Sequence, residues 1–268
     1  MKESPKKITV PAVRELKGRR KLTMVTAYDA PSARIVDEAG VDIALVGDSL
    51  GMVIQGRADT LAVTLDQMVY HMEIVARSTA RALVVGDMPF LTFQISDERT
   101  IESAGRLIQA GAAAVKLEGG GKIAERIRAV TEIGIPVMAH LGLTPQSLHQ
   151  MGGYKVQGRD AEASRRILDE AKRIQDAGAF AVVLEGIPAP LAKQITDQLS
   201  IPTIGIGAGL HCDGQVLVFH DLVGLSGDRT PTFVRRYADL RVTAVEAVKQ
   251  FKSDVEAGRF PSEGESYR

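Results

Sequence analysis

Eight short apolar runs, separated by helical or loop segments, constrain the fold of this chain more than any other feature of its sequence. Each run is nearly continuous in apolar character, as expected of parallel strands that are covered on both faces. We therefore predict eight parallel strands, the last of them from the weakest pattern. The runs are LTMVTAYD (22–29), DIALVGD (42–48), ALVVGD (82–87), AAVKLE (113–118), IPVMAH (135–140), FAVVLE (180–185), IPTIGIG (201–207) and LVGL (222–225).

Amphipathic segments that end in glycine lie between several of these runs. A helix, a glycine cap and then a strand form the second half of a βαβ unit. A doubly wound sheet would need fewer units and usually a Gly-rich loop after its first strand, whereas TAYDAPS follows the first strand here. Eight strands in 268 residues predict a (β/α)8 TIM barrel. The segments are SARIVDEAG, ERTIESAGRLIQAGA, AERIRAVTEIG and AEASRRILDEAKRIQDAGA, which end at or beside Gly40, Gly111, Gly134 and Gly178.

No linker or low-complexity segment interrupts the sequence, so we predict one domain over residues 1–268. Residues 1–20 form an N-terminal arm with a short helix, capped by Thr9 and with Pro11 in its first turn. Residues 231–268 form a C-terminal helix, VRRYADLRVTAVEAVKQFKSDVEAG, and a tail. The amphipathic pattern of this helix is compatible with packing on the barrel or on a neighbouring subunit.

Charge and cysteine content exclude several classes of protein. Lys and Arg number 33 and Asp and Glu number 33, so there is no electrostatic basis for binding nucleic acid or an anionic membrane. Cys212 is the single cysteine, which excludes a disulfide framework and a Cys-rich zinc site. No apolar run approaches the ~18 residues of a membrane span, and the N-terminal residues lack a secretory h-region. We expect a cytoplasmic protein.

Five of the eight runs end in a side chain that can do chemistry. The C-terminal ends of barrel strands converge on one mouth, where the active sites of such enzymes lie. Any single acid could instead cap the following helix. Four carboxylates and an imidazole at equivalent positions are harder to explain as caps, and Glu is a poor N-cap. The residues are Asp48, Asp87, Glu118, His140 and Glu185.

Clustered carboxylates repel one another unless a cation lies among them. Oxygen ligands without thiolates indicate a hard ion such as Mg²⁺ or Mn²⁺. Zn²⁺, Co²⁺ or Ni²⁺ would fit if His140 were also a ligand, although a hydrogen-bonding role for His140 is favoured. Lys116 and Glu118 are two apart on one strand and therefore face the same side. They form a ligand set, an ion pair in the mouth, or a buried structural salt bridge.

Two loops also have suggestive sequences. The segment 141–159 is long and polar, which is typical of a lid or a binding loop, and its Tyr154, Lys155 and Arg159 could contact an anion. The segment GIGAG (205–209) is equally compatible with a phosphate site and with a tight turn. Cys212 is interpreted as a structural thiol.

Several motifs together resemble the ketopantoate hydroxymethyltransferase family. The resemblance covers about residues 8–268, and HLGLTPQS and GGYKVQGR are long enough to make it specific. The sequence departs from the expected pattern at Arg57 and Ala62, outside these motifs. The motifs are VGDSLGM (46–52), DMPF (87–90), KLEGG (116–120), HLGLTPQS (140–147), GGYKVQGR (152–159), IGIGAG (204–209), CDGQVLV (212–218) and, more loosely, FPSEGESYR.

The resemblance implies a TIM-barrel enzyme of pantothenate biosynthesis. Such an enzyme transfers a one-carbon unit from 5,10-methylenetetrahydrofolate to C3 of 3-methyl-2-oxobutanoate and so forms 2-dehydropantoate. It implies Mg²⁺ or a similar ion, and a homo-oligomer that is commonly a decamer.

The resemblance also implies roles for individual residues. Asp48 and Asp87 would bind the metal directly, and Glu118 would complete the metal site through water. Glu185 would accept the proton from C3. The substrate would lie among Asp48, Ser49, Asp87, Lys116 and His140, with Ser49 and Lys116 on its carboxylate and His140 in a supporting polar role.

Three alternatives compete with this interpretation. The first is a metal-dependent lyase or mutase of the phosphoenolpyruvate mutase and isocitrate lyase group, acting on another 2-oxo acid. The second is a Schiff-base aldolase with Lys116 as nucleophile. The third is a binding or assembly protein built on an inactive barrel.

Overall fold

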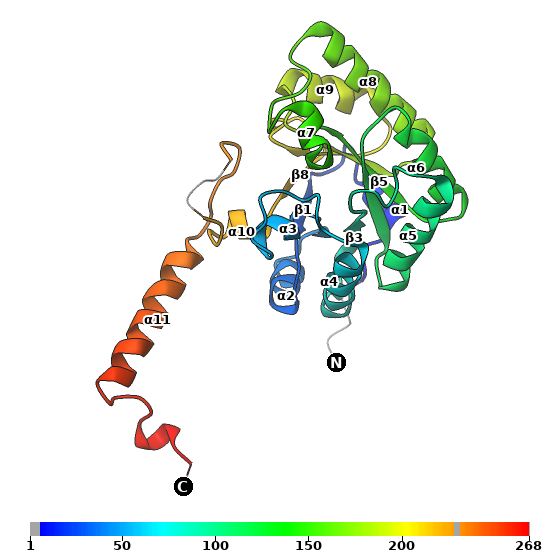
Figure 1. Cartoon of the computed structure of the whole chain (residues 1–268). Coiled ribbons are helices and arrows are strands. Elements are labelled where there is room, and N and C mark those ends of the chain that lie inside the picture. The colour runs from blue at the N-terminus through cyan, green and yellow to red at the C-terminus, as the bar shows by residue number, and fades with distance from the viewer. Residues whose placement is uncertain (1–5, 228–230, 268) are drawn as a thin grey trace. The chain divides into compact units, whose positions relative to one another are not determined.

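Eight parallel strands close into a barrel in the computed structural model, which describes residues 6–227 and 231–267 (Figure 1). Each strand pairs with the next along the chain, and β8 pairs with β1. The predicted fold is therefore confirmed. The strands are β1 (Leu22–Thr26), β2 (Ile43–Val46), β3 (Leu83–Asp87), β4 (Ala114–Glu118), β5 (Val137–Gly142), β6 (Ala181–Glu185), β7 (Thr203–Ile206) and β8 (Gly214–Leu217).

Helices connect the strands and surround them (Figure 1). The four predicted helices are confirmed, and each is followed by a glycine with positive φ. At Gly111 an added Cβ would also lie 2.6 Å from the Cβ of Ala76, so no other residue fits this turn. The helices of the barrel unit are α1 (Val10–Glu15), α2 (Ala30–Glu38), α3 (Leu50–Val53), α4 (Leu65–Ser78), α5 (Asp97–Gln109), α6 (Ile123–Glu132), α7 (Leu148–Met151), α8 (Ala161–Asp176) and α9 (Ala189–Gln198), with a 3₁₀ turn η1 (Pro145–Ser147).

The eighth strand was predicted at the wrong place. It is formed by Gly214–Leu217, whereas the predicted run LVGL (222–225) begins at the last residue of the short helix α10 (Phe219–Leu222) and continues into the turn after it. A side chain at position 214 would lie 2.7 Å from the carbonyl oxygen of Leu22, so close pairing with β1 requires glycine there. Glycine and the exposed Gln215 conceal the apolar pattern on which the prediction rested.

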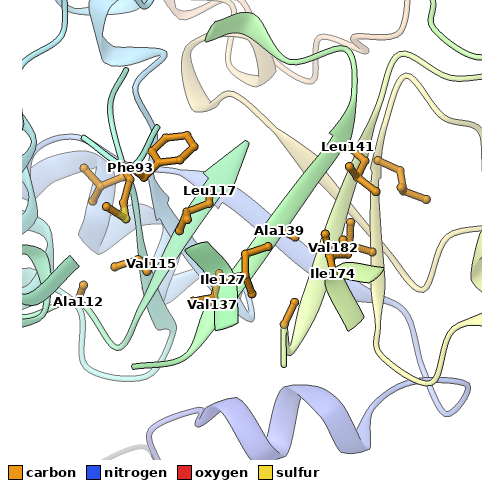
Figure 2. Packing of buried hydrophobic residues seen from close by; sticks show 14 of the residues in the cluster. Phe93, Ala112, Val115, Leu117, Ile127, Val137, Ala139, Leu141, Ile174 and Val182 are labelled. Carbon is orange, nitrogen blue, oxygen red and sulfur yellow. The ribbon is translucent and has the colours of Figure 1, made fainter. Parts of the chain in front are cut away.

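Alternate side chains of the strands face two different cores. One set fills the barrel interior. The other packs against the surrounding helices, and Figure 2 shows part of this outer core. Along β4, Ala114 belongs to the inner core while Val115 and Leu117 belong to the outer one, which leaves Lys116 and Glu118 on the inner side. The inner core includes Leu22, Met24, Ile43, Leu45, Leu83, Val85, Met138, Ala181, Val183, Ile204 and Val216.

Helix α1 packs against the N-terminal end of the barrel. It is capped by Thr9 with Pro11 in its first turn, as predicted, and its buried Val13 joins the inner core. Beyond the helix, Lys17 binds Asp213 at 2.8 Å. Arg20 donates two hydrogen bonds to Asp42, at 2.6 and 2.9 Å, and so completes this end of the barrel. Residues 1–5 of the predicted arm lie outside the described residues.

The residues from Phe219 onward form a second compact unit. Its main helix, α11 (Leu240–Glu256), begins later than the sequence pattern predicted. The N–H groups of Tyr237 and Leu240 donate to the carbonyls of Leu222 and Val223, which holds the preceding residues in a non-helical path. A 3₁₀ turn, η2 (Glu263–Glu265), follows. Among residues 6–227 and 231–267, none of the helices is long and apolar enough to span a bilayer.

We expect Asp42→Ala to destabilise the barrel by about 1–3 kcal/mol, because the backbone N–H of Thr23 would lose its buried acceptor and Arg20 its partner. Asp66→Ala is the matched control. Its carboxylate binds Arg106 at the same 2.6 Å but is 82% exposed, against 2% for Asp42. Asp66→Ala should lower the free energy of unfolding by less than about 1 kcal/mol. Denaturant unfolding measures both, and equal losses would contradict the account.

Candidate active site at the barrel mouth

Strand register brings most of the predicted site residues to one end of the barrel. Asp87 is paired with Lys116 across β3 and β4, and Glu118 is paired with His140 across β4 and β5. Glu185 occupies the corresponding last position of β6. These residues continue the inward-facing rows of the strands and so form the top layer of the barrel interior.

Asp48 and Ser49 reach the same mouth from the turn that follows β2. The backbone N–H of Asp48 donates to Oδ2 of Asp87 at 3.1 Å, which ties this turn to the end of β3. Ser49 is the residue immediately before the short helix α3. Its Oγ lies 2.7 Å from the hydroxyl oxygen of Tyr28, which follows β1. The β2 turn therefore adds a carboxylate and a hydroxyl to the side chains that the strands supply.

Lys116 is the central cation of the cluster. Its Nζ lies 2.6 Å from Oδ1 of Asp87 and 3.9 Å from Oε1 of Glu118, and the residue is only 4% exposed. The short contact with Asp87 has the geometry of an ion pair without a well-aligned hydrogen bond. Burial alone would lower the pKa of Lys116, but Asp87, Glu118 and Asp48 outweigh it and raise the pKa. Lys116 is therefore held as an ammonium.

Two of the carboxyl groups lie in surroundings that disfavour their ionised form. Burial, followed by repulsion from Glu118 and Asp87, raises the pKa of Asp48 well above its usual value. Burial also raises the pKa of Asp87, although Lys116 opposes the shift. The pKa of Glu118 is lowered despite its burial, because His140, Lys116 and the backbone N–H of Gln146 favour its ionised form.

His140 lies between two carboxylates. Its Nδ1 is 3.3 Å from Oε1 of Glu118, and its Nε2 is 3.2 Å from Oε2 of Glu185. Both contacts are at ion-pair distance without the alignment of a good hydrogen bond. Burial and Lys116 would lower the pKa of His140, but the two carboxylates raise it to about 9. The imidazole thus links Glu185 to the rest of the cluster.

Acidic groups outnumber basic groups in this cluster. Four carboxyl side chains, Asp48, Asp87, Glu118 and Glu185, share the mouth with one lysine and one histidine, and the raised pKa of Asp48 and of Asp87 reflects this crowding as well as burial. In the described part of the chain, no three His, Cys, Asp or Glu side chains already stand in metal-binding geometry. Mg²⁺ commonly takes only one or two protein carboxylates and fills its shell with water and substrate oxygens. Asp48 and Asp87 fit that requirement.

Two neutral residues of the site were not predicted. Tyr28 is fully buried, and its hydroxyl contacts Ser49. Gln146, in η1, donates from Nε2 to Oδ2 of Asp48 and from its backbone N–H to Oε2 of Glu118. Both lie in segments that the sequence singled out, TAYD and HLGLTPQS. Neither residue is an acid, lysine or histidine at the end of a strand, so the pattern that predicts the other site residues does not identify them.

The predicted loop after β5 reaches across the mouth. The hydroxyl of Tyr154 lies 3.6 Å from the sulfur of Met52, which is in α3. The pKa of Tyr154 is raised by partial burial and by nearby acids that include Glu185 and Asp48. This loop thus approaches the carboxylate cluster. The two unusual positions of the β2–α4 connection, Arg57 and Ala62, contact each other, because the Arg57 guanidinium donates to the Ala62 carbonyl.

Comparison with known sequences decides the family. A model of the ketopantoate hydroxymethyltransferase family matches residues 7–263. The chain belongs to this family. Its relatives include the 3-methyl-2-oxobutanoate hydroxymethyltransferase of Geobacter metallireducens, which is 53% identical over 98% of this chain and 99% of the relative. The enzyme of the same name from Trichlorobacter lovleyi is 56% identical over the same shares of both chains. The resemblance seen in the sequence motifs is confirmed.

Solved structures of other enzymes share the fold of this family member. A crystal structure of 2,3-dimethylmalate lyase, of the PEP mutase/isocitrate lyase superfamily, matches with a TM-score of 0.62 at 19% identity over 98% of this chain and 93% of the lyase. A phosphonopyruvate hydrolase in complex with oxalate and Mg²⁺ matches with a TM-score of 0.63 at 15% identity, over 96% of this chain and 93% of the hydrolase. At these identities the likeness shows the fold alone.

The raised pKa of His140 predicts a pH-dependent stability. Its ordinary value is 6.5 and its value in the folded chain is about 9, so the stabilisation is fully present below about pH 6.5 and is lost as the pH rises through 9. In metal-free buffer, the unfolding free energy of the native protein minus that of His140→Asn should therefore shrink from pH 6.5 to 9.5. A difference that is constant or grows with pH would contradict the assignment.

Proposed function

We propose that this chain transfers a hydroxymethyl group from 5,10-methylenetetrahydrofolate to 3-methyl-2-oxobutanoate and forms 2-dehydropantoate, a step of pantothenate biosynthesis. The name carried by its relatives supports the substrates. The observation that carries the proposal is the buried cluster of Asp48, Asp87, Glu118 and Lys116 beside Glu185. This set of groups suits removal of a proton next to a 2-oxo acid.

Asp48 and Asp87 are proposed as direct ligands of Mg²⁺ or a related divalent ion, with Glu118 acting through water. When bound, the ion supplies Lewis acidity that stabilises negative charge on the 2-oxo oxygen. Lys116 neutralises the substrate carboxylate, and Ser49, whose hydroxyl is oriented by Tyr28, donates to the same group. The protein side chains therefore anchor the acid end of the substrate and leave its C3 hydrogen accessible.

Glu185 is proposed as the base that removes this hydrogen. It is the least buried of the four carboxylates in the mouth, so it can reach a substrate that enters from solvent. His140 contacts Glu185 on one side and Glu118 on the other, and so restricts the position of the base. The carbanion formed at C3 then bonds to the methylene carbon of the folate as one C–N bond to that carbon breaks. Water replaces the remaining C–N bond and supplies the hydroxyl oxygen, and the freed nitrogens take up the protons, which releases tetrahydrofolate. Holding both substrates in one mouth supplies the orientation that this bimolecular step needs.

The proposed assembly is a homo-oligomer, with a decamer implied by the family resemblance, in the cytoplasm. Within Leu240–Glu256 no side chain is buried. The helix nevertheless carries exposed apolar residues, which in an oligomer would be covered by a neighbouring subunit. These residues are Leu240, Val242, Val245, Val248, Phe251 and Val255.

The alternatives have less support. The 2,3-dimethylmalate lyase and phosphonopyruvate hydrolase structures share the fold at 19% and 15% identity, whereas the two hydroxymethyltransferases match at 53% and 56%. A Schiff-base aldolase needs a neutral lysine. Lys116 is held in a 2.6 Å ion pair with Asp87, which keeps it charged.

One assay tests the proposed reaction. The protein is incubated with 3-methyl-2-oxobutanoate, methylenetetrahydrofolate and Mg²⁺, and 2-dehydropantoate is sought by mass spectrometry. We expect product formation that stops with a chelator and returns with excess Mg²⁺. Activity that survives the chelator, together with covalent trapping of the substrate by borohydride, would establish the aldolase instead.

The role of the base is tested without folate. In D₂O the native protein should exchange the C3 hydrogen of 3-methyl-2-oxobutanoate for deuterium, as followed by proton NMR. Glu185→Gln should slow this exchange about 10²- to 10⁴-fold, the usual contribution of a general base. Glu132→Gln, at the exposed end of α6, is the control and should exchange at the native rate. Native exchange by Glu185→Gln would remove Glu185 from this role.

A further inference from the structure

Gln146 joins the loop after β5 to two of the three carboxylates proposed to hold the cation. Its side-chain Nε2 donates to Oδ2 of Asp48 at 2.9 Å, and its backbone N–H donates to Oε2 of Glu118 at 3.0 Å. Asp48 follows β2 and Glu118 ends β4, so one residue connects carboxylates from two strands that are not paired with each other. Gln146 is only 6% exposed, and a buried amide of this kind keeps its partners in fixed positions.

The orientation of the Gln146 amide is determined by its neighbours. Nε2 also donates to the carbonyl of Met88 at 2.9 Å, and both this oxygen and the Asp48 carboxylate can only accept. Oε1 therefore faces the other way, where it accepts from Nε2 of Gln94 at 3.0 Å. Gln94 lies in the loop after β3, so three loops of the mouth meet at one amide. The amide cannot flip without losing all three bonds.

We propose that Gln146 is a positioning residue that fixes one carboxylate oxygen of Asp48 and one of Glu118, and so prepares them for a divalent cation. The inference rests on the proposed function. Gln146 acts through these carboxylates and is assigned no contact with substrate. Its amide donates to Asp48 without adding charge to a cluster already rich in carboxylates. Groups that orient metal-binding side chains in this way commonly contribute 10- to 100-fold to metal affinity.

Binding of Mn²⁺ to the full-length protein without substrate, followed by electron paramagnetic resonance, tests the proposal. Gln146→Met keeps the length of the side chain and the backbone bond to Glu118 but removes the donor to Asp48. We expect the Kd for Mn²⁺ to rise about 10- to 100-fold. The melting temperature of the metal-free variant should be close to that of the metal-free native protein. The rise in melting temperature on adding Mn²⁺ should be smaller for the variant than for the native protein.

Two further variants keep the test decisive. Gln150→Met, the same substitution at an exposed position of α7, should bind Mn²⁺ as tightly as the native protein. Gln94→Met, at a partly exposed position, removes the group that orients the amide and should raise the Kd by less than Gln146→Met does. If Gln146→Met fails to fold, Gln94→Met decides, and a native Kd for it overturns the proposal.

The outcomes also separate this inference from the proposed function. A native protein that forms 2-dehydropantoate and binds Mn²⁺, with a Gln146→Met variant of equal affinity, overturns the positioning role alone. A native protein that neither forms this product nor binds Mn²⁺ removes the proposed function and the positioning role with it.

Discussion

Repulsion among buried carboxylates is the constraint on which the mouth of this barrel depends. Asp48, Asp87 and Glu118 are almost completely shielded from water, where like charges interact strongly. Lys116 relieves part of the repulsion through its ion pair with Asp87, and His140 relieves part through Glu118. The cations that the chain itself supplies are still outnumbered. Such a site is poorly balanced alone and well suited to a divalent ion.

The barrel tolerates this repulsion because the charged groups are confined to one layer at its mouth. Below the site, the inward rows of the strands carry Leu, Val, Ile, Ala and Met, and α1 closes the far end with Val13. The ion pairs at that far end, Lys17 with Asp213 and Arg20 with Asp42, lie on the opposite face from the chemistry. The proposed chemistry and these structural ion pairs therefore lie at different ends of the same strands and can be tested separately.

Much of this arrangement could be predicted from the sequence because each parallel strand of the barrel can have two signals, an apolar run and a polar residue at the end of that run. Their apolar runs identify the first seven strands, and the last residue of a run identifies what enters the mouth, as for Asp87, Glu118 and Glu185. The eighth strand has neither signal. Contact with Leu22 requires glycine at position 214, and Gln215 is exposed, so the strand lacks a continuous apolar run. The late start of α11 depends on hydrogen bonds to the carbonyls of Leu222 and Val223, and no local sequence pattern predicts these bonds.

The neutral residues of the site were the harder part to predict. Tyr28 and Gln146 act through hydrogen bonds to Ser49, Asp48 and Glu118, and neither residue type is unusual in a loop. Their positions become meaningful only when the strands bring distant loops together. The proposed division of roles among the carboxylates likewise follows from their surroundings, since Glu185 is more exposed than Asp48, Asp87 and Glu118.

The most direct test of the central claim is to count the protons released when Mg²⁺ binds. Burial and mutual repulsion raise the pKa of Asp48 and of Asp87, so a cation that binds them must displace protons. Calorimetric titration at a series of pH values from the ordinary carboxyl range up to neutrality, in two buffers with different ionisation enthalpies at each pH, measures this number. The account predicts net proton release that falls as the pH rises. Binding with the same observed heat in both buffers at every pH would contradict it.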